Sequence, residues 1–414
     1  MTARAPLVLA ALLAVSPLAA APPDFSDDVP EALLEDTKLA PPVLAPTPAG
    51  PVEPWPWLAA KGDSSGDVTL LFFGDLNLQD RAEPALAFRH LLPTLRAADF
   101  RFCNLEMALV PPSTDSRRPD IEHKPLWRHS HPSQVQGLVG AGIDAVGFGS
   151  NVAYPADTTV LPTIAVLRAA GIPHTGSGAN LAEAHRPLVL QRRGVRLGIL
   201  HFNSLVWPEN HRAGADRPGV ATLRATTSYQ PHRRIHEMPG GPARVVTTPL
   251  ASDLARLVAL VRELRPQVDV LALSMQWGVS SSSQPADYQR IAARAALDAG
   301  ADFVFGHGPH VLQAVELHGG RPVFHSLANF AFDWERQRKN VDGLVLRVVV
   351  RDRRPIRYAL VPLKRDAAND PVLLDPTEGL GAAMAAELIH LSGGPGRAPL
   401  EVEGREIVVR PPGG

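Results

Sequence analysis

The chain has 414 residues, of which 45% are hydrophobic, so it is long enough to bury a large core. Its 41 Lys and Arg residues nearly balance its 42 Asp and Glu residues, which gives a formal net charge of −1. This balance lacks the basic excess typical of nucleic-acid-binding proteins, and we expect no nucleic-acid partner. The single cysteine, Cys103, excludes an intrachain disulfide and a zinc site built from several cysteines.

The first 21 residues have the features of a secretory signal peptide. Arg4 precedes an apolar stretch at residues 7–15, and small residues follow at 19–21. The apolar stretch is short for a bilayer span, although an uncleaved membrane anchor is the alternative. Residues 22–67 are rich in Pro and acidic residues without a sustained period, which predicts an extended segment. We therefore expect an exported protein, periplasmic or extracellular, that is soluble after cleavage of residues 1–21.

From residue 68 onward, short apolar runs alternate with helical patterns. The expected strands are Val68–Phe73, Ala145–Phe148, Leu197–Phe202, Val268–Leu273, Phe303–Phe305 and Pro322–His325. The expected helices are Leu161–Ala170, Leu250–Leu264 and Tyr288–Ala299, each followed closely by Gly or Pro. Strands that are apolar on both faces and alternate with helices are typical of an α/β fold, in which helices cover the sheets.

Two segments depart from this alternation. Residues 208–248 are polar and form a predicted insertion in the main domain, which we assign to residues 68–365. A loop this long is more often functional or partly disordered than structural padding. Residues 366–414 contain a helical stretch at Gly379–Leu391 and a predicted final strand at Glu401–Arg410. We interpret them as a cap on the same domain.

Polar side chains follow nearly every predicted strand, at the sheet edge where α/β proteins collect ligands. They include Asp75, Glu106, Asn151, Gln276, His307, His310 and Asn329. Taken one at a time, an Asp after a strand is more often a helix cap and an Asn more often a turn residue. Two histidines in one Gly-Pro turn are harder to explain in this way. Carboxylates, an amide and imidazoles together suit Zn, Mn or Fe, and two such ions would activate water.

The order of these motifs resembles the CapA family of poly-γ-glutamate capsule synthesis proteins. The resemblance runs from about Thr69 to Leu363 and is most specific over Asp298–Asp333. The matching motifs are Gly74-Asp75, Asn104-Leu105-Glu106, the Asn151 turn, Gln276-Trp277-Gly278, Gly306-His307-Gly308-Pro309-His310 and Ser326-Leu327-Ala328-Asn329-Phe330.

The resemblance implies a calcineurin-like metallophosphoesterase fold, a four-layer sandwich in which helices flank two facing β-sheets and a metal site lies at one edge. It implies that a divalent ion (Mn, Zn or Fe) is bound by Asp75, Glu106, Asn151, His307 and His310. We assign substrate contacts to Gln276, Trp277 and Asn329, with core packing as the alternative for Trp277. Family members are associated with capsule polymer synthesis or export, usually beside membrane-bound capsule synthesis proteins.

Three positions depart from the family pattern. Val152 replaces the histidine of an Asn-Asn-His turn, Gln276 replaces the histidine of His-Trp-Gly, and Gly308 replaces the second of two paired histidines. Two functions therefore stay open. The first is a metal-dependent hydrolase or transferase that acts on an envelope polymer or its precursor. The second is a non-catalytic binding or assembly component that keeps the fold. Bound metal with hydrolytic activity would support the first, and an empty site the second.

Overall fold

The structure is a computed structural model that describes residues 66–410, except residues 116 and 338. The predicted signal peptide and almost all of the predicted extended segment lie outside the described residues. Within the part of the chain that is described, none of the helices combines the length and the apolar character that a membrane span requires.

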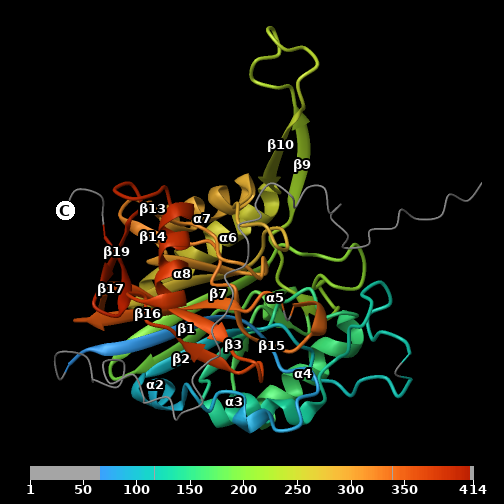
Figure 1. The fold of residues 1–414 in the computed structure, drawn as a ribbon. Coiled ribbons are helices and arrows are strands. Elements are labelled where there is room, and N and C mark those ends of the chain that lie inside the picture. The colour runs from blue at the N-terminus through green and yellow to red at the C-terminus, as the bar shows by residue number, and fades with distance from the viewer. Residues whose placement is uncertain (1–65, 116, 338, 411–414) are drawn as a thin grey trace, which may run out of the picture. The chain divides into compact units, whose positions relative to one another are not determined.

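The larger sheet contains ten strands among the described residues (Figure 1). Its parallel half consists of β1 (Val68–Asn77), β2 (Phe100–Leu105), β3 (Ala145–Gly147) and β4 (His174–Thr175). Its antiparallel half consists of β16 (Asp342–Arg351), β17 (Arg354–Arg365), β20 (Glu406–Val409) and β19 (Leu400–Glu403). β15 (Asn329–Phe332) pairs in parallel with the end of β1, and β18 (Pro371–Leu373) pairs with β17.

The smaller sheet contains six strands in the described region, in the order β13-β14-β12-β11-β7-β6. The parallel strands are β7 (Val195–Asn203), β11 (Val270–Gln276), β12 (Phe303–His307) and β14 (Arg321–Phe324). The antiparallel edge strands are β6 (Leu188–Arg192) and β13 (Val315–His318). The carboxyl ends of its parallel strands therefore lie at one edge, as they do in the parallel half of the larger sheet.

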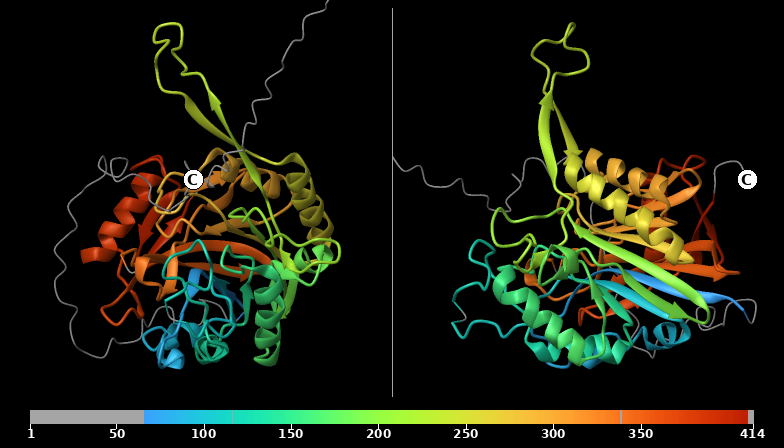
Figure 2. Two further views of the ribbon diagram at one scale, coloured as in Figure 1. Left: turned by 90° about the vertical axis from the view of Figure 1, so that its right-hand side faces the viewer. Right: turned by 180° about the vertical axis from the view of Figure 1, so that it is seen from behind.

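Helices cover the outer face of each sheet (Figures 1 and 2). Those on the larger sheet are α2 (Leu92–Ala97), α3 (Val135–Ala141) and α4 (Ala156–Ala169). Those on the smaller sheet are α6 (Ala251–Leu264) and α7 (Asp287–Ala299). α8 (Gly379–Leu391) contributes to the apolar cluster between the sheets, and α5 (Leu181–Ala184) is a single short turn. Short 3₁₀ helices lie at Pro84–Leu86, Pro132–Gln134, Arg265–Gln267 and Glu335–Gln337.

The burial pattern of β1 explains why its sequence is apolar on both faces. Leu71 and Phe73 pack into the cluster beneath α2–α4, whereas Leu70 and Phe72 pack into the cluster shared by the two sheets. Successive side chains of a strand point to opposite faces, so a strand covered on both sides carries no polar alternation. The predicted α/β architecture of two sheets flanked by helices is confirmed.

Two of the predicted elements differ most clearly from the sequence prediction. The single strand predicted over Glu401–Arg410 was wrong, because the segment folds into the antiparallel pair β19 and β20. The chain reverses at Gly404, whose φ of 58° lies in the left-handed region that glycine adopts readily. α4 begins at Ala156, five residues earlier than predicted, and the Thr159 hydroxyl donates to the Pro155 carbonyl oxygen in its first turn.

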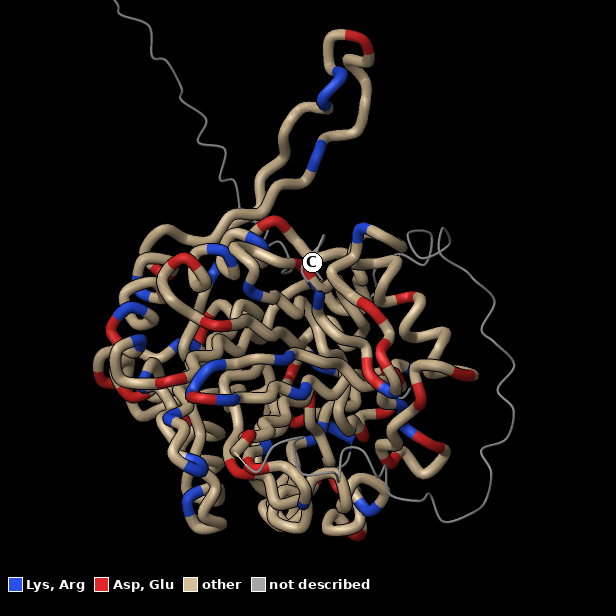
Figure 3. Tube along the Cα trace, turned by 90° about the vertical axis from the view of Figure 1, so that its left-hand side faces the viewer, with Lys and Arg blue, Asp and Glu red and all other residues tan. Residues whose placement is uncertain are grey.

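The polar segment predicted as an insertion contains a projecting strand pair. β9 (Ala225–Gln230) and β10 (Arg244–Pro249) pair with each other and extend away from the two sheets (Figures 1 and 2). Every residue of β9 is exposed. Earlier in the same segment, β8 (Gly219–Val220) pairs with β5 (Ser177–Gly178). Basic and acidic residues are interspersed along the described chain, including this hairpin (Figure 3).

Candidate metal centre

Asp75 is held at the carboxyl end of β1 by an irregularity in the strand. The pairing register of β1 shifts beside Asp75 on both its β2 side and its β15 side. The Asp75 N–H donates to the Ala328 carbonyl oxygen at 2.9 Å. A Cβ at Gly74 would overlap that same oxygen, so only glycine permits this close approach. Strand irregularities of this kind re-aim a side chain, and here they direct the Asp75 carboxylate to the sheet edge.

Three of the five predicted metal ligands come together at this edge. One ligand atom each from Asp75, Glu106 and His310 lie within 4.8 Å of one another, and all three residues are buried. His310 Nδ1 lies 3.2 Å from Asp75 Oδ2, and His310 Nε2 lies 3.7 Å from Glu106 Oε1. His310 has a φ of 60°, an uncommon conformation for a residue other than glycine that is found often at functional sites.

Neighbouring groups fix the orientation of the Asp75 and His310 side chains. Asn104 Nδ2 donates to Asp75 Oδ1 at 2.8 Å, and the Gly308 N–H donates to Asp75 Oδ2 at 2.9 Å. His310 Nδ1 lies 3.0 Å from Asn329 Oδ1, which can only accept, so Nδ1 carries the proton. His310 Nε2 is then the ring nitrogen that faces Glu106. A histidine ligand is commonly oriented by such a bond to its other nitrogen.

The three groups interact strongly through their charges. Burial alone would raise the pKa of Asp75, but the hydrogen bond and positive charge of His310 outweigh it and lower that pKa. Burial opposes the charge on His310, yet Glu106 and Asp75 raise the pKa of the imidazole above its usual value. Burial and the negative charge of Asp75 raise the pKa of Glu106 to about 8. At neutral pH, Asp75 is therefore ionised and Glu106 holds a proton, and the charged form of His310 is favoured relative to a free imidazole.

The donor set fits a divalent cation. Glu106 Oε2 is buried and has no hydrogen-bond partner within the described part of the chain. Leaving a buried polar atom unpaired costs free energy, and a cation bound between the two carboxylates and His310 Nε2 would remove that cost. Carboxylate oxygens together with imidazole nitrogen suit Mn, Zn or Fe. The geometry of Asp75, Glu106 and His310 is thus compatible with a metal ion.

His307 lies beside the cluster, but both of its ring nitrogens are engaged. His307 Nδ1 lies 2.9 Å from Gln276 Oε1, an atom that only accepts, so Nδ1 must donate. The Ser274 hydroxyl then donates to His307 Nε2 at 3.0 Å. Burial lowers the pKa of His307 to about 4, which keeps the ring neutral. Its Nδ1 is 3.5 Å from Asp75 Oδ1, so His307 is a neighbour of that carboxylate rather than a member of the converging triad.

The row of hydrogen bonds continues beneath His307. His201 Nδ1 lies 2.9 Å from Ser274 Oγ, and the imidazoles of His201 and His307 stack with centroids 5.5 Å apart. Because the Ser274 hydroxyl donates to His307, it accepts from His201. The sequence pattern does not single out Ser274, and it favours a core role for His201. Ser274 lies within a run of hydrophobic residues in β11, and that pattern carries no signal for such a row of hydrogen bonds.

Asn151 is also close to the cluster, with its amide oxygen already accepting bonds. Gln276 Nε2 donates to Asn151 Oδ1 at 3.2 Å, and Ser150 Oγ donates to the same atom at 3.1 Å. Gln276 Oε1 accepts from Asn104 Nδ2 at 2.5 Å. Gln276, predicted to contact substrate, therefore links Asn104, His307 and Asn151 into one network.

The other two predicted substrate contacts lie in different surroundings. Asn329 Nδ2 donates to the Asn340 carbonyl oxygen at 2.9 Å, and its Oδ1 holds His310. The indole N–H of Trp277 donates to the His325 carbonyl oxygen at 2.8 Å, and its ring is fully buried in the cluster beneath α6 and α7. Asn329 thus borders the metal cluster, whereas Trp277 packs in the core.

Val152 follows the Asn151 turn and packs among apolar side chains. It is fully buried in a cluster with Ile121, Trp127, Phe332 and Trp334. The histidine implied there by the family pattern is thus replaced by a core contact that can neither donate nor accept a proton.

A loop after β7 contacts the same turn and was not predicted as part of the site. Trp207 Nε1 donates to the Asn151 carbonyl oxygen at 2.7 Å, and the Ser204 N–H donates to the Gln276 carbonyl oxygen at 2.8 Å. The Trp207 ring stacks on Tyr154 with centroids 4.7 Å apart. Nothing in the spacing of these residues signals the contact, because it depends on how the polar segment folds back.

The chain matches a known protein family and several of its relatives. Residues 69–334 match the family model described as bacterial capsule synthesis protein PGA_cap. The chain is similar to the PGA biosynthesis protein CapA of Bacillus subtilis, with 25% identity over 293 residues, 70% of this chain and 67% of that protein. It is 24% identical over 317 residues to the capsule biosynthesis protein CapA of Bacillus anthracis, covering 74% and 69% of the two chains. A probable polyglutamine synthesis accessory protein of Mycobacterium tuberculosis is 28% identical over 246 residues, 58% of this chain and 57% of that protein.

Two solved structures have a distant likeness in fold. A phosphatase from Mycoplasma pneumoniae has 11% identity and a TM-score of 0.41, covering 72% of this chain and 94% of that one. A hypothetical protein from Thermus thermophilus has 13% identity and a TM-score of 0.40, covering 72% and 99%. These scores are too low to support a functional argument.

Proposed function

The chain belongs to the bacterial capsule synthesis protein family PGA_cap, and we propose that it is an exported, metal-dependent hydrolase or transferase of an anionic envelope polymer. The relatives named for capsule or polyglutamine synthesis support the polymer as the target. Poly-γ-glutamate or its precursor is the substrate that we propose, and membrane-bound capsule synthesis proteins are the partners. The signal-peptide pattern of residues 1–21 supports the exported location.

The observation that carries the catalytic proposal is the unpaired oxygen of Glu106. Buried polar atoms are mostly paired in folded proteins, because an unpaired one destabilises the fold. Glu106 Oε2 instead lies buried without a partner among the described residues, beside a second carboxylate and an imidazole nitrogen. This arrangement supports a cation as the missing partner.

Asp75, Glu106 and His310 Nε2 would hold the ion. When bound, such an ion polarises a carbonyl or phosphoryl oxygen and lowers the pKa of a coordinated water. Asn104 and the Gly308 N–H keep Asp75 oriented, and Asn329 keeps the proton of His310 on Nδ1. Glu106, with its pKa near 8, can hold or release a proton at its carboxylate. Binding of the ion requires this proton to leave.

A non-catalytic binding or assembly role is the second candidate, and one observation favours it. Val152 is packed into an apolar cluster at the position where the family pattern has a histidine. That position therefore supplies no general acid, and a positioned acid or base typically contributes about 10²–10⁴-fold to a rate. In this second case the cluster would bind a cation and polymer without turning the polymer over.

The test combines metal content with polymer cleavage. Mature protein and Glu106→Gln would be analysed for bound Mn, Zn and Fe, and both would be incubated with poly-γ-glutamate whose length is followed by size-exclusion chromatography. Glu237→Gln, on the projecting hairpin and exposed, is the matched control. We expect metal and chain shortening in the parent and control, and neither in Glu106→Gln. Metal without cleavage or transfer would favour the binding role, and unchanged metal in Glu106→Gln would refute the ligand assignment.

A further inference from the structure

A pocket of about 720 Å³ opens between the loop after β7 and the base of the β9–β10 hairpin. Ser204, Trp207, Arg212, Arg217 and Arg224 are among the residues that line it. Ser204 and Trp207 also donate the hydrogen bonds to Gln276 and Asn151 described above. One wall of the pocket is thus bonded directly to the polar network around the cluster.

His211 fixes the loop that forms this wall. The Trp207 N–H donates to His211 Nδ1 at 3.2 Å, and His211 Nε2 donates to the Ser150 carbonyl oxygen at 3.1 Å. Both ring nitrogens of this buried imidazole are therefore engaged. His211 ties the loop to the Ser150–Asn151 turn, so the pocket keeps a defined position relative to the cluster.

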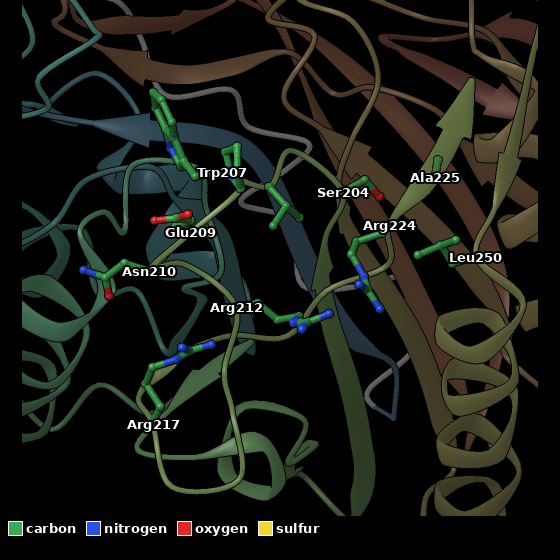
Figure 4. A pocket seen from close by; sticks show the side chains of 11 residues that line it. Ser204, Trp207, Glu209, Asn210, Arg212, Arg217, Arg224, Ala225 and Leu250 are labelled. Carbon is green, nitrogen blue, oxygen red and sulfur yellow. The ribbon is translucent and has the colours of Figure 1, made fainter. Parts of the chain in front are cut away.

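The pocket has an excess of cationic groups. Arg224 forms an ion pair of 2.8 Å with Asp253, which neutralises it. Arg212 and Arg217 are exposed, and across the described residues no ion pair or side-chain hydrogen bond engages either guanidinium. Glu209 also lines the pocket and offsets one of these two charges. Figure 4 shows the three arginines gathered in one part of the pocket, with Trp207 and Glu209 in another.

We infer that Arg212 and Arg217 form a binding subsite for an anionic group, a carboxylate or a phosphate, of the molecule whose reacting part lies at the metal cluster. A guanidinium presents a planar fork of donors that matches the paired oxygens of such groups. The flat ring of Trp207 provides an apolar part of the pocket wall. An anionic polymer carries the repeated charges that this arrangement would bind. The placement of the reacting end of the ligand rests on the proposed function, whereas the anion binding itself does not.

The experiment measures binding of a fluorescein-labelled γ-linked glutamate oligomer by anisotropy, with the side-chain-amidated oligomer as the neutral probe. The variants are Arg212→Gln, Arg217→Gln and the double variant. Arg233→Gln, at the exposed hairpin tip, removes the same charge outside the pocket. We expect each pocket substitution to weaken oligomer binding about tenfold, as the loss of one charge-assisted hydrogen bond would. The control should bind like the parent, and the neutral probe should bind weakly to all.

Inorganic phosphate serves as competitor and distinguishes the two sources of the anion. Displacement of the oligomer by phosphate at lower concentrations than acetate would identify a phosphate subsite, and the reverse a carboxylate subsite. Failure of the parent to bind both the oligomer and phosphate would overturn the inference. So would equal binding by the double variant and the parent, or equal weakening in Arg233→Gln.

Metal content, measured on the same samples, separates this inference from the proposed function. We expect the arginine variants to retain the metal. A parent protein without metal that still shows arginine-dependent binding would refute the metal proposal and leave the anion subsite standing. Thermal unfolding of each variant checks that the exposed substitutions leave the fold intact.

Discussion

His307 ends strand β12 and His310 lies three residues further along the chain, yet the two histidines belong to different environments. His307 is neutral, and both of its ring nitrogens are bonded within a row of hydrogen bonds that includes Gln276, Ser274 and His201. His310 faces two carboxylates, one of which has a buried oxygen without a partner in the described structure. Ligand chemistry therefore depends on which ring nitrogens are already committed, and not on the presence of a histidine at a strand end.

The largest expected effect is on divalent metal affinity, which should distinguish the environment of His310 from that of His307. Asp75→Asn removes a charge from the triad and should weaken divalent metal binding by more than about a hundredfold. Loss of a group that only orients a ligand costs about 10–100-fold in metal affinity, and loss of a direct ligand should cost more. His307→Gln should weaken it by no more than about tenfold. Isothermal titration with Mn or Zn measures both, and Asp298→Asn, on an exposed carboxylate, is the control. Equal losses in Asp75→Asn and His307→Gln would contradict the distinction.

The pH dependence of metal binding tests the protonation of the triad. The pKa of Glu106 is raised to about 8, so an ion that binds below this pH must displace the Glu106 proton. The pKa of His310 is also raised, which favours a second proton that the ion would displace. Affinity should therefore increase as pH rises from 6 to 8, by about tenfold per pH unit for each proton displaced, and level off above. Competition with a chromophoric chelator of known pH dependence gives the slope. An affinity that is flat over this range would show that the groups are already deprotonated.

Gln276→His is expected to disrupt the row of hydrogen bonds around His307. The imidazole would replace the amide oxygen that accepts from His307 Nδ1, and would return the histidine that the family pattern has at this position. We expect an increase in metal affinity of about tenfold, which corresponds to one additional favourable interaction near ~1.4 kcal/mol, or a second metal equivalent. Elemental analysis after dialysis gives the stoichiometry. Gln276→Asn is the control. Unchanged metal binding in both variants would indicate that the hydrogen bonds of His307 do not limit the metal affinity of the site.

The smallest expected effect is on stability and concerns His211, which fixes the loop that forms one wall of the pocket. Burial lowers the pKa of His211 to about 4, below its ordinary value, so the unfolded chain takes up the proton first as pH falls. The stabilising contribution is thus complete above about pH 6.5 and is lost progressively toward pH 4, with a loss of about 0.8 kcal/mol already at pH 6. Urea unfolding of the parent and His211→Gln at pH 7.5 and 6 measures this.

The result to expect is a smaller loss of unfolding free energy between the two pH values in His211→Gln than in the parent. His131→Gln, on an exposed histidine, is the control and should lose as much as the parent. Identical pH dependence in the parent and His211→Gln would mean that His211 is not held neutral by the fold.

Much of the architecture could be predicted because it follows from local patterns. The apolar runs at β1, β7, β11 and β12 are buried on both faces, and Gly or Pro ends the helices between them. The placement of Asp75, Glu106 and His310 at strand ends could also be predicted, since ligand-binding residues of α/β proteins collect at the carboxyl ends of strands.

The hydrogen-bond and packing partners of individual side chains could not be predicted. Whether His307 is free or bonded depends on Ser274 and Gln276, which reach it from the neighbouring strand β11. The burial of Trp277 depends on helix packing, and the contact of Trp207 with Asn151 depends on how a long polar segment folds back. These are long-range contacts with no period or motif in the sequence.

The most direct test of the central claim is a crystal structure of the protein grown with Mn or Zn, with anomalous scattering recorded at the metal edge. We predict a peak between Asp75, Glu106 and His310, within bonding distance of His310 Nε2. A second group of possible ligands, His90, Asp366 and Asp370, has its Asp370 carboxylate already paired with Arg81 and Arg89, and we expect no peak there. No peak at the first position, or a peak only at the second, would contradict the account.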